Sequence, residues 1–524
     1  MRTRLIKVSM ILSLLLIIIT GCDSSSHNSS NESEIVWGEC PVYINTHGNA
    51  ECAFITVPVD YERPFDETID LFIWRIRGAS PDSEKKGNLW LIMGGPGESS
   101  VAFSALLPPL AAAYPDWDYY SMDHRGVGNS NGLECPVAAP DSRITPENAA
   151  SCYDEVQALH NGTLGSYSVT NAAKDLYIVI TRTCGLRKTF VYGVSYGTYL
   201  VQRFMTLYPD SVEGVILDSI VPSDSRPLDN YDSSFNDVGR QIMQQCRDDD
   251  VCSGKLSEIA SDPWQAMEIV FGMIDDQSLC SGFLSITRKD LRNKLAVLSS
   301  NMYGRALIPA VIYRLCRCNE SDKAAIGHLF SDTAKVKAQN EEFKPVDRLN
   351  SSVVYENIAI SELYDGMSPE AAQEIVDAAC VSEDIVPDLA GIKYYNLWPA
   401  YDDPFKGRNP EYYKPVLMIN STVDGPTPLS LALGAAEYLH GPYHYFVQVP
   451  WAAHGAVFQS PAEGKLTPID EMTGLKIMME FISDPFTDPD TSVLDKCYIL
   501  DFSGSSVENR FISEKFFGSA DMWD

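Results

Sequence analysis

One strand–turn–helix segment constrains the fold of this chain more than any other feature. Residues 189–194 have the sequence T-F-V-Y-G-V, a β-branched and aromatic run typical of a strand, and residues 196–207 are an apolar stretch typical of a helix. Ser195 lies between them in G-V-S-Y-G, where the flanking glycines leave room for a sharp turn with strained backbone at the serine. Such a turn holds a serine hydroxyl above the edge of a sheet, where it can act as a nucleophile. The alternative is a glycine-rich turn with an incidental serine.

A serine nucleophile needs a histidine to accept its proton and a carboxylate to orient that histidine. Asp424 and His454 each follow a short apolar strand, so we expect both in loops beyond strand ends. All the other histidines precede the strand that leads to His454. Asp218, which also ends a strand, is the rival acid, but the acid is expected late, shortly before the histidine. We therefore predict that Ser195, His454 and Asp424 form a proton relay.

A second loop is suited to stabilising negative charge on a substrate. Residues 89–93 form a buried-strand run that leads directly into G-G-P-G at residues 94–97. We predict that the backbone N–H of Gly95 and that of Tyr196, the residue after the nucleophile, hold the oxyanion of a tetrahedral intermediate. The alternative is a turn that only ends the strand.

These motifs together resemble a known family. The chain has M-G-G-P-G at 93–97, D-H-R-G-V-G-N-S at 123–130 and G-V-S-Y-G-T at 193–198, with the candidate triad in the order Ser, Asp, His. The combination resembles the proline iminopeptidase and tripeptidyl aminopeptidase family, and most closely its secreted, tripeptidyl-aminopeptidase-like branch, over most of residues 35–500. The resemblance implies an α/β-hydrolase fold, with a mostly parallel central sheet, helices on both faces and an inserted helical lid. It also implies a serine exopeptidase that removes di- or tripeptides from peptide substrates with free N-termini. Met93 departs from the family, which usually has a histidine there.

The pattern of strand-like and helical segments changes along the chain. Strand-like and helical runs alternate up to about residue 225 and strands resume near residue 415, whereas the region between has helical runs without strand periodicity. We predict a first core half at 35–225, a helical lid insertion at 226–405, and a second core half with a C-terminal tail at 406–524. We expect Cys497 to staple that tail to the body.

An exopeptidase that acts at a free N-terminus needs a carboxylate to pair with the substrate ammonium. Glu362, in A-I-S-E, resembles the place where relatives carry a C-S-E motif ahead of a W-P segment, here Trp398-Pro399. Glu383, in V-S-E-D, is a second candidate. Each has the alternative of being an ordinary solvated acid of the lid.

The N-terminus predicts where the protein works. Residues 1–22 contain three basic residues, an apolar stretch too short to span a bilayer comfortably, and I-T-G-C at the end, which resembles a bacterial lipobox. We predict a lipoprotein signal peptide, lipidation of Cys22 and a flexible tether at 23–34, which would anchor the protein to a membrane of the bacterial cell envelope on its periplasmic or extracellular face. The alternative is a signal peptide that is cleaved without lipidation.

The cysteines agree with export. Thirteen cysteines minus the lipid-bearing Cys22 leave twelve, an even number that favours disulfides outside the cytoplasm. Sequence neighbours suggest three pairs: Cys40 with Cys52, Cys135 with Cys152, and Cys246 with Cys252. No cysteine or histidine set has zinc spacing, so we expect no metal site.

Charge restricts the partners. The chain has 71 acidic and 40 basic residues and a formal net charge of −31, which argues against a nucleic-acid partner. No cofactor is expected. Two functions remain as alternatives to the exopeptidase: an esterase or other small-molecule acyl hydrolase with the same machinery, and a non-catalytic surface binding protein.

Overall fold

The computed structural model describes residues 35–45, 48–137, 143–184, 187–282, 285–338 and 349–524. Ile35–Asp524 forms one compact unit, and the segment Met1–Glu34, with the predicted signal peptide, Cys22 and tether, lies outside the described residues. Among the helices of the described ranges, none combines the length and the hydropathy that a membrane span requires.

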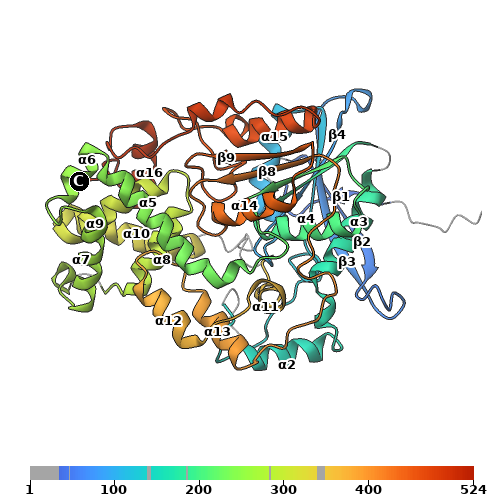
Figure 1. Ribbon diagram of the computed structural model, residues 1–524, viewed down its shortest axis with the longest axis horizontal. Coiled ribbons are helices and arrows are strands. Elements are labelled where there is room, and N and C mark those ends of the chain that lie inside the picture. The colour runs from blue at the N-terminus through green and yellow to red at the C-terminus, as the bar shows by residue number, and fades with distance from the viewer. Residues whose placement is uncertain (1–34, 46–47, 138–142, 185–186, 283–284, 339–348) are drawn as a thin grey trace, which may run out of the picture. The chain divides into compact units, whose positions relative to one another are not determined.

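A single nine-stranded sheet forms the centre of the unit, with the strands in the order β1-β2-β3-β5-β4-β6-β7-β8-β9 (Figure 1). The first four strands in this order pair antiparallel, and all remaining neighbours pair parallel. The strands are β1 (Gly38–Glu39), β2 (Ala50–Pro58), β3 (Thr68–Arg77), β4 (Gly87–Ile92), β5 (Trp117–Met122), β6 (Thr189–Val194), β7 (Gly214–Asp218), β8 (Val416–Ser421) and β9 (His444–Val449).

The parallel strands are hydrophobic because helices cover both of their faces. Every residue of β4, β5, β6, β7 and β8 is buried. One face packs against α2 (Ala149–Leu159), α3 (Val169–Cys184), α4 (Tyr196–Leu207) and α14 (Leu429–Tyr438), and the other against α1 (Leu107–Ala113) and α15 (Thr473–Ser483). This is the predicted architecture, with helices on both faces of a mostly parallel sheet.

The register of the parallel strands brings several loops to one edge. Ile92 pairs with Gly193, Val194 with Asp218, and Asp218 with Ile419, so the carboxyl ends of β4, β6, β7 and β8 lie side by side. In open α/β sheets this edge is where ligands bind.

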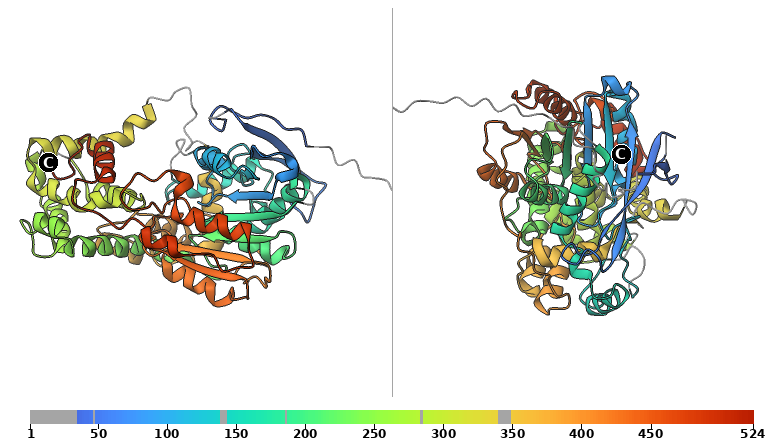
Figure 2. Two further views of the ribbon diagram at one scale, coloured as in Figure 1. Left: turned by 90° about the horizontal axis from the view of Figure 1, so that it is seen from above. Right: turned by 90° about the vertical axis from the view of Figure 1, so that its right-hand side faces the viewer.

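Helices fill the chain between β7 and β8, where the lid insertion was predicted. Its first helices enclose a hydrophobic core of their own beside the sheet, whereas α11 and α13 pack against the core of the sheet (Figures 1 and 2). The helices are α5 (Tyr231–Arg247), α6 (Asp250–Leu256), α7 (Pro263–Asp275), α8 (Arg288–Ser299), α9 (Ile308–Arg317), α10 (Glu320–Ala338), α11 (Ser352–Ile358), α12 (Pro369–Ala378) and α13 (Val386–Tyr394).

The C-terminal tail differs from the prediction. Cys497 is a buried free thiol, so no disulfide staples the tail to the body. Instead α16 (Val507–Phe517) buries Phe517 in the core of the insertion, together with Trp523. Arg314 of α9 donates hydrogen bonds to the carbonyl oxygens of Asp521 and Met522 near the end of the tail. Packing and hydrogen bonds therefore replace the expected covalent link.

The three predicted disulfides are present, and a fourth joins Cys280 to Cys318. Four of the cysteines in the described residues are free thiols: Cys184, Cys316, Cys380 and Cys497. The side chains of Cys184 and Cys497 instead contact polar groups of the sheet and of α15.

Candidate active site

Ser195 occupies a strained turn between β6 and α4. Its backbone has φ 57° and ψ −128°, outside the regions that non-glycine residues usually adopt. A Cβ on Gly193 would lie 2.6 Å from the carbonyl oxygen of Gly197, and a Cβ on Gly197 would lie 2.5 Å from that of Ile92. Only glycine fits at both positions, so the sequence G-V-S-Y-G is what allows the turn to close.

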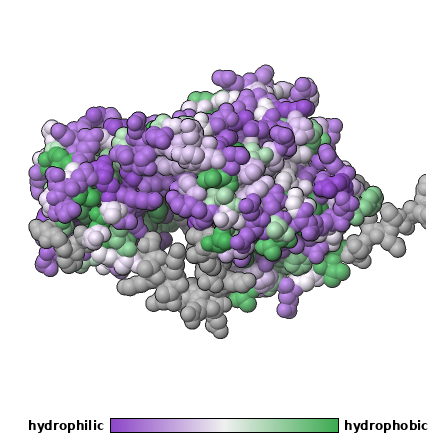
Figure 3. Space-filling model, turned by 90° about the horizontal axis from the view of Figure 1, so that it is seen from below, coloured by the Kyte–Doolittle hydropathy of each residue, from purple (hydrophilic) through white to green (hydrophobic). Residues whose placement is uncertain are grey.

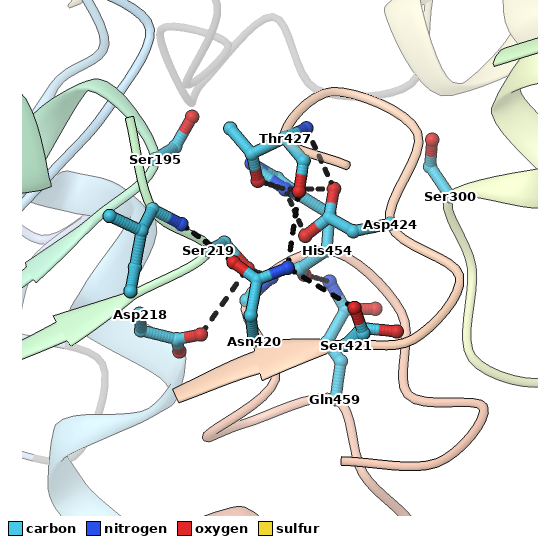
Figure 4. Close-up of polar contacts among 12 residues, drawn as sticks. Ser195, Asp218, Ser219, Ser300, Asn420, Ser421, Asp424, Thr427, His454 and Gln459 are labelled. Carbon is cyan, nitrogen blue, oxygen red and sulfur yellow. Dashed lines mark hydrogen bonds and ion pairs between the residues drawn. The ribbon is translucent and has the colours of Figure 1, made fainter. Parts of the chain in front are cut away.

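His454 and Asp424 meet beyond the ends of β9 and β8. His454 Nδ1 lies 2.9 Å from Oδ1 and 3.0 Å from Oδ2 of Asp424 (Figure 4). The Thr427 backbone N–H donates to Asp424 Oδ1 at 2.9 Å and fixes the carboxylate further. Because an ionised carboxylate can only accept, Nδ1 carries the proton and Nε2 is left free to accept one.

The two groups shift each other's pKa in opposite directions. Burial alone would raise the pKa of Asp424, but the charge and hydrogen bond of His454 outweigh it and lower that pKa below its ordinary value. Burial alone would lower the pKa of His454, but the Asp424 carboxylate outweighs it and raises that pKa above its ordinary value. Asp424 is therefore held ionised, and His454 is made a stronger base.

Asp218, the rival acid, contacts other groups. Its Oδ2 accepts hydrogen bonds from the Tyr192 hydroxyl at 2.7 Å and from the Val457 backbone N–H at 2.9 Å. Burial raises the pKa of Asp218 to about 6. Its role is to hold the loop after β9, because its bonds connect β6 and β7 with that loop.

A short network links the loops that carry the acid and the histidine. Asn420, near the end of β8, accepts from the Ile220 backbone N–H and donates to the Thr427 carbonyl oxygen (Figure 4). Ser219 Oγ accepts from the Gly455 backbone N–H at 2.8 Å. These bonds tie the end of β7 to both loops.

Arg305, a buried residue of the insertion, also supports the histidine and was missed in the sequence. Its guanidinium donates to the carbonyl oxygens of Ala452 at 3.0 Å and Trp451 at 3.3 Å, just ahead of His454, and to that of Ser299. Burial lowers the pKa of Arg305 to about 10. No local pattern around residue 305 signals this role, since the two carbonyl groups ahead of His454 lie almost 150 residues away along the chain.

The predicted nucleophile, base and oxyanion donors open onto one cavity of about 610 Å³. The residues that line it include Ser195, Tyr196, Gly95 and His454. No hydrogen bond joins the Ser195 hydroxyl to His454 among the contacts of the described residues, and in unliganded active sites this bond is often long.

The loop after β4 packs directly against the serine. A Cβ on Gly94 would lie 2.8 Å from Ser195 Cβ, and Gly95 has φ +106°. Tyr196 is the first residue of α4, so its N–H has no acceptor within the helix. Gly95 and Tyr196, the two predicted oxyanion donors, thus line the same cavity as Ser195.

The two candidate carboxylates for a substrate ammonium lie in different surroundings. Glu383 lines the cavity, and the Tyr231 hydroxyl donates to its Oε2 at 3.1 Å. Glu362 is fully buried and does not line the cavity; its carboxylate is already paired with Arg203 at 2.7 Å and accepts from the hydroxyls of Tyr199 and Tyr401. The structure therefore does not support Glu362, because its oxygens already have partners in the core.

Clusters of three or more His, Cys, Asp or Glu side chains that could hold a metal are absent from the described part of the chain.

Part of this chain is similar in sequence to known proteins. Residues 88–246 match the family model described as the alpha/beta hydrolase fold. The chain is 31% identical over 210 residues to a tripeptidyl aminopeptidase of Streptomyces coelicolor, covering 36% of this chain and 38% of that protein. It is 26% identical over 250 residues to the serine protease Hip1 of Mycobacterium tuberculosis, covering 44% and 46% of the two chains. The matched region thus spans less than half the length of these relatives.

Among solved structures, a thermophilic esterase from Thermogutta terrifontis aligns with a TM-score of 0.29 at 15% identity, covering 76% of this chain and 91% of the esterase.

Proposed function

We propose that this chain, which has the α/β-hydrolase fold and is similar to tripeptidyl aminopeptidases over part of its sequence, is a serine exopeptidase that cleaves short peptides from free N-termini. The observation that carries the proposal is the placement of Ser195 in a strained turn on the same cavity as a histidine bonded to a buried carboxylate. Each of these groups has the environment that its proposed role requires.

In the proposed mechanism Ser195 Oγ attacks the carbonyl carbon of the substrate while His454 Nε2 takes the hydroxyl proton. Asp424 remains ionised and stabilises the imidazolium, which its lowered pKa favours. The N–H groups of Gly95 and Tyr196 stabilise the oxyanion, and each such donor contributes about 10² to 10³ in rate. His454 then protonates the leaving amine, and a water activated by the same imidazole releases the acyl group from Ser195.

We propose that Glu383 binds the substrate ammonium. It lies on the insertion, at the wall of the cavity, where burial raises its pKa and the Tyr231 hydroxyl partly offsets that effect. An ammonium in the cavity would offset the cost of burying this charge. The insertion at 226–405 would then act as the lid that measures the distance from the N-terminus to Ser195.

The disulfides bear on where in the cell the protein acts. Four disulfides indicate an exported protein. We propose, further, that Cys22 is lipidated and anchors the protein to a membrane of the bacterial cell envelope. Metabolic labelling with a palmitate analogue tests this, since Cys22→Ala should remove the label from the full chain.

The test of the function compares three kinds of substrate. Peptides with free N-termini should be hydrolysed, the same peptides with acetylated N-termini should be poor substrates, and mass spectrometry of the products should show di- or tripeptides. Fluorophosphonate should label the protein but not Ser195→Ala. Rapid hydrolysis of short acyl esters with no hydrolysis of any free peptide would favour the esterase, and no labelling would favour a binding protein.

A further inference from the structure

Glu98 is an unpaired carboxylate in the candidate active site. It directly follows G-G-P-G and lines the same cavity as Ser195 and His454, where its side chain is exposed. In the described part of the chain its carboxylate makes no hydrogen bond and no ion pair, and its one charged neighbour is His454. Desolvation by the surrounding cavity wall raises the pKa of Glu98 above its ordinary value, and the positive charge of His454 opposes this shift.

A buried carboxylate with a structural role has hydrogen-bond or ion-pair partners within the protein, and Glu362 is an example. Glu362 is buried with an arginine and two tyrosine hydroxyls around its oxygens. Glu98 has none of these partners in the described part of the chain, and it lines the open cavity instead. The difference indicates that the partner of Glu98 comes from outside the chain.

The cavity is lined by acidic side chains, which favour a cationic ligand. Glu98 and Glu383 line it, while none of its described lining residues is a lysine or an arginine. Apolar side chains such as Phe103, Leu106 and Met302 form part of its walls. A ligand with a positive charge on an aliphatic stem matches such a cavity, because the stem packs on the apolar wall and the charge meets the carboxylate.

The position of Glu98 relative to the reacting carbonyl is fixed by the loop. A Cβ on Gly95 would lie 3.2 Å from Glu98 Cγ, so the glutamate stem packs next to the proposed oxyanion donor. The following residue, Ser99, is anchored through its hydroxyl to buried Asp123 at 2.8 Å. The stem of Glu98 is therefore held beside the proposed oxyanion donor, on the cavity that Ser195 also lines.

We propose that Glu98 is a specificity-determining residue that binds the cationic side chain of the substrate residue whose carbonyl Ser195 attacks, which makes lysine and arginine the preferred residues there. The inference rests on the proposed function in so far as it assigns Ser195 as the nucleophile. Two carboxylates on one cavity then serve two positive charges, with Glu383 binding the N-terminal ammonium and Glu98 the side chain.

The test compares matched substrates on the full chain and on Glu98→Gln, which keeps the shape of the side chain and removes its charge. Each pair carries either lysine or uncharged norleucine at the attacked residue, once in a free peptide and once in a p-nitrophenyl ester. The parent protein should prefer lysine, and Glu98→Gln should lower kcat/KM for lysine by about 10- to 100-fold, as expected for loss of a charged hydrogen bond. The norleucine substrates should change by less than about threefold, because they do not use the carboxylate. Glu98→Lys should prefer a glutamyl substrate instead.

The possible results separate this inference from the proposed function. Lysine preference in the esters, lost in Glu98→Gln, supports the inference even if no peptide is hydrolysed, in which case the exopeptidase proposal alone fails. Equal hydrolysis of lysyl and norleucyl substrates by the parent protein overturns the inference. An equal loss on both substrates in Glu98→Gln also overturns it, since the glutamate would then act on the loop or on the N-terminal ammonium.

Discussion

The backbone N–H of Ser351 donates a hydrogen bond to the carbonyl oxygen of Gly97 at a distance of 2.8 Å. Ser351 is the N-cap of α11 in the insertion, and Gly97 belongs to the loop that carries the proposed oxyanion donor. The contact is close, since a Cβ on Gly97 would lie 2.4 Å from the Ser351 carbonyl oxygen. The neighbouring Asn350 accepts from the Ser99 backbone N–H at 2.9 Å. The insertion therefore positions the loop after β4 as well as covering the cavity.

Asn350→Ala removes the acceptor for the Ser99 N–H and should displace the loop that carries the proposed oxyanion donor. We expect kcat to fall by about tenfold with little change in KM, because an oxyanion donor stabilises mainly the transition state. Steady-state kinetics on one peptide substrate measures both constants. Asn409→Ala is the control, since the side chain of Asn409 bonds to exposed Asp224 and to no other side chain in the described part of the chain. If Asn350→Ala raised KM at constant kcat, the loop would serve substrate binding rather than charge stabilisation.

The fold and the turn that carries Ser195 could be predicted because their signals are local. The strand and helix around Ser195 were placed at 189–194 and 196–207, the same bounds that the structure gives. The contacts that could not be predicted join residues far apart in the sequence. Glu362 resembled a substrate ligand, and only the fold shows that Arg203, 159 residues away, already pairs with it. The sequence around Arg305 and Ser351 contains no motif that predicts their contacts, because Ala452 and Gly97, with which they bond, belong to distant segments of the chain.

Two buried aspartates next to the same loops provide a matched pair of variants. Asp424→Asn should lower kcat by about 10⁴, because the amide no longer fixes the imidazole in the tautomer that accepts a proton. Asp218→Asn should stay within about tenfold of the parent protein, since it loses no bond to His454, and should lower the thermal stability instead. Kinetics and thermal melts of both variants give the comparison. A larger loss of kcat in Asp218→Asn would show that the acid is misassigned.

The dependence of kcat/KM on pH should report the state of His454. The imidazole must be neutral to accept the serine proton, so activity should fall as the pH drops through its pKa. Because Asp424 raises that pKa, the acid limb should have its midpoint above the ordinary value of about 6.5. In Asp424→Asn the residual activity should show a midpoint shifted to lower pH, since the charge that chiefly opposes the effect of burial on this pKa is removed. Glu98 and Asp218 also raise this pKa, so Glu98→Gln should move the limb the same way by a smaller amount.

Two fully buried arginines of the insertion allow the support of His454 to be separated from general stability. Arg305→Met removes the donors to the carbonyl oxygens of Trp451 and Ala452, so the loop before His454 loses its fixed position. We expect the free energy of unfolding to fall by about 1–3 kcal/mol from the unpaired carbonyls. We expect kcat to fall by up to about 10²-fold from the misplaced imidazole.

Arg314→Met is the control for this variant. Arg314 is equally buried, but it pairs with Asp322 and bonds to the C-terminal tail, away from the cavity. It should lower the stability by a similar amount while kcat stays near that of the parent protein. Urea unfolding and steady-state kinetics on the two variants measure both effects. A parallel loss of kcat in both would mean that activity follows stability alone, and that Arg305 has no separate part in holding the histidine.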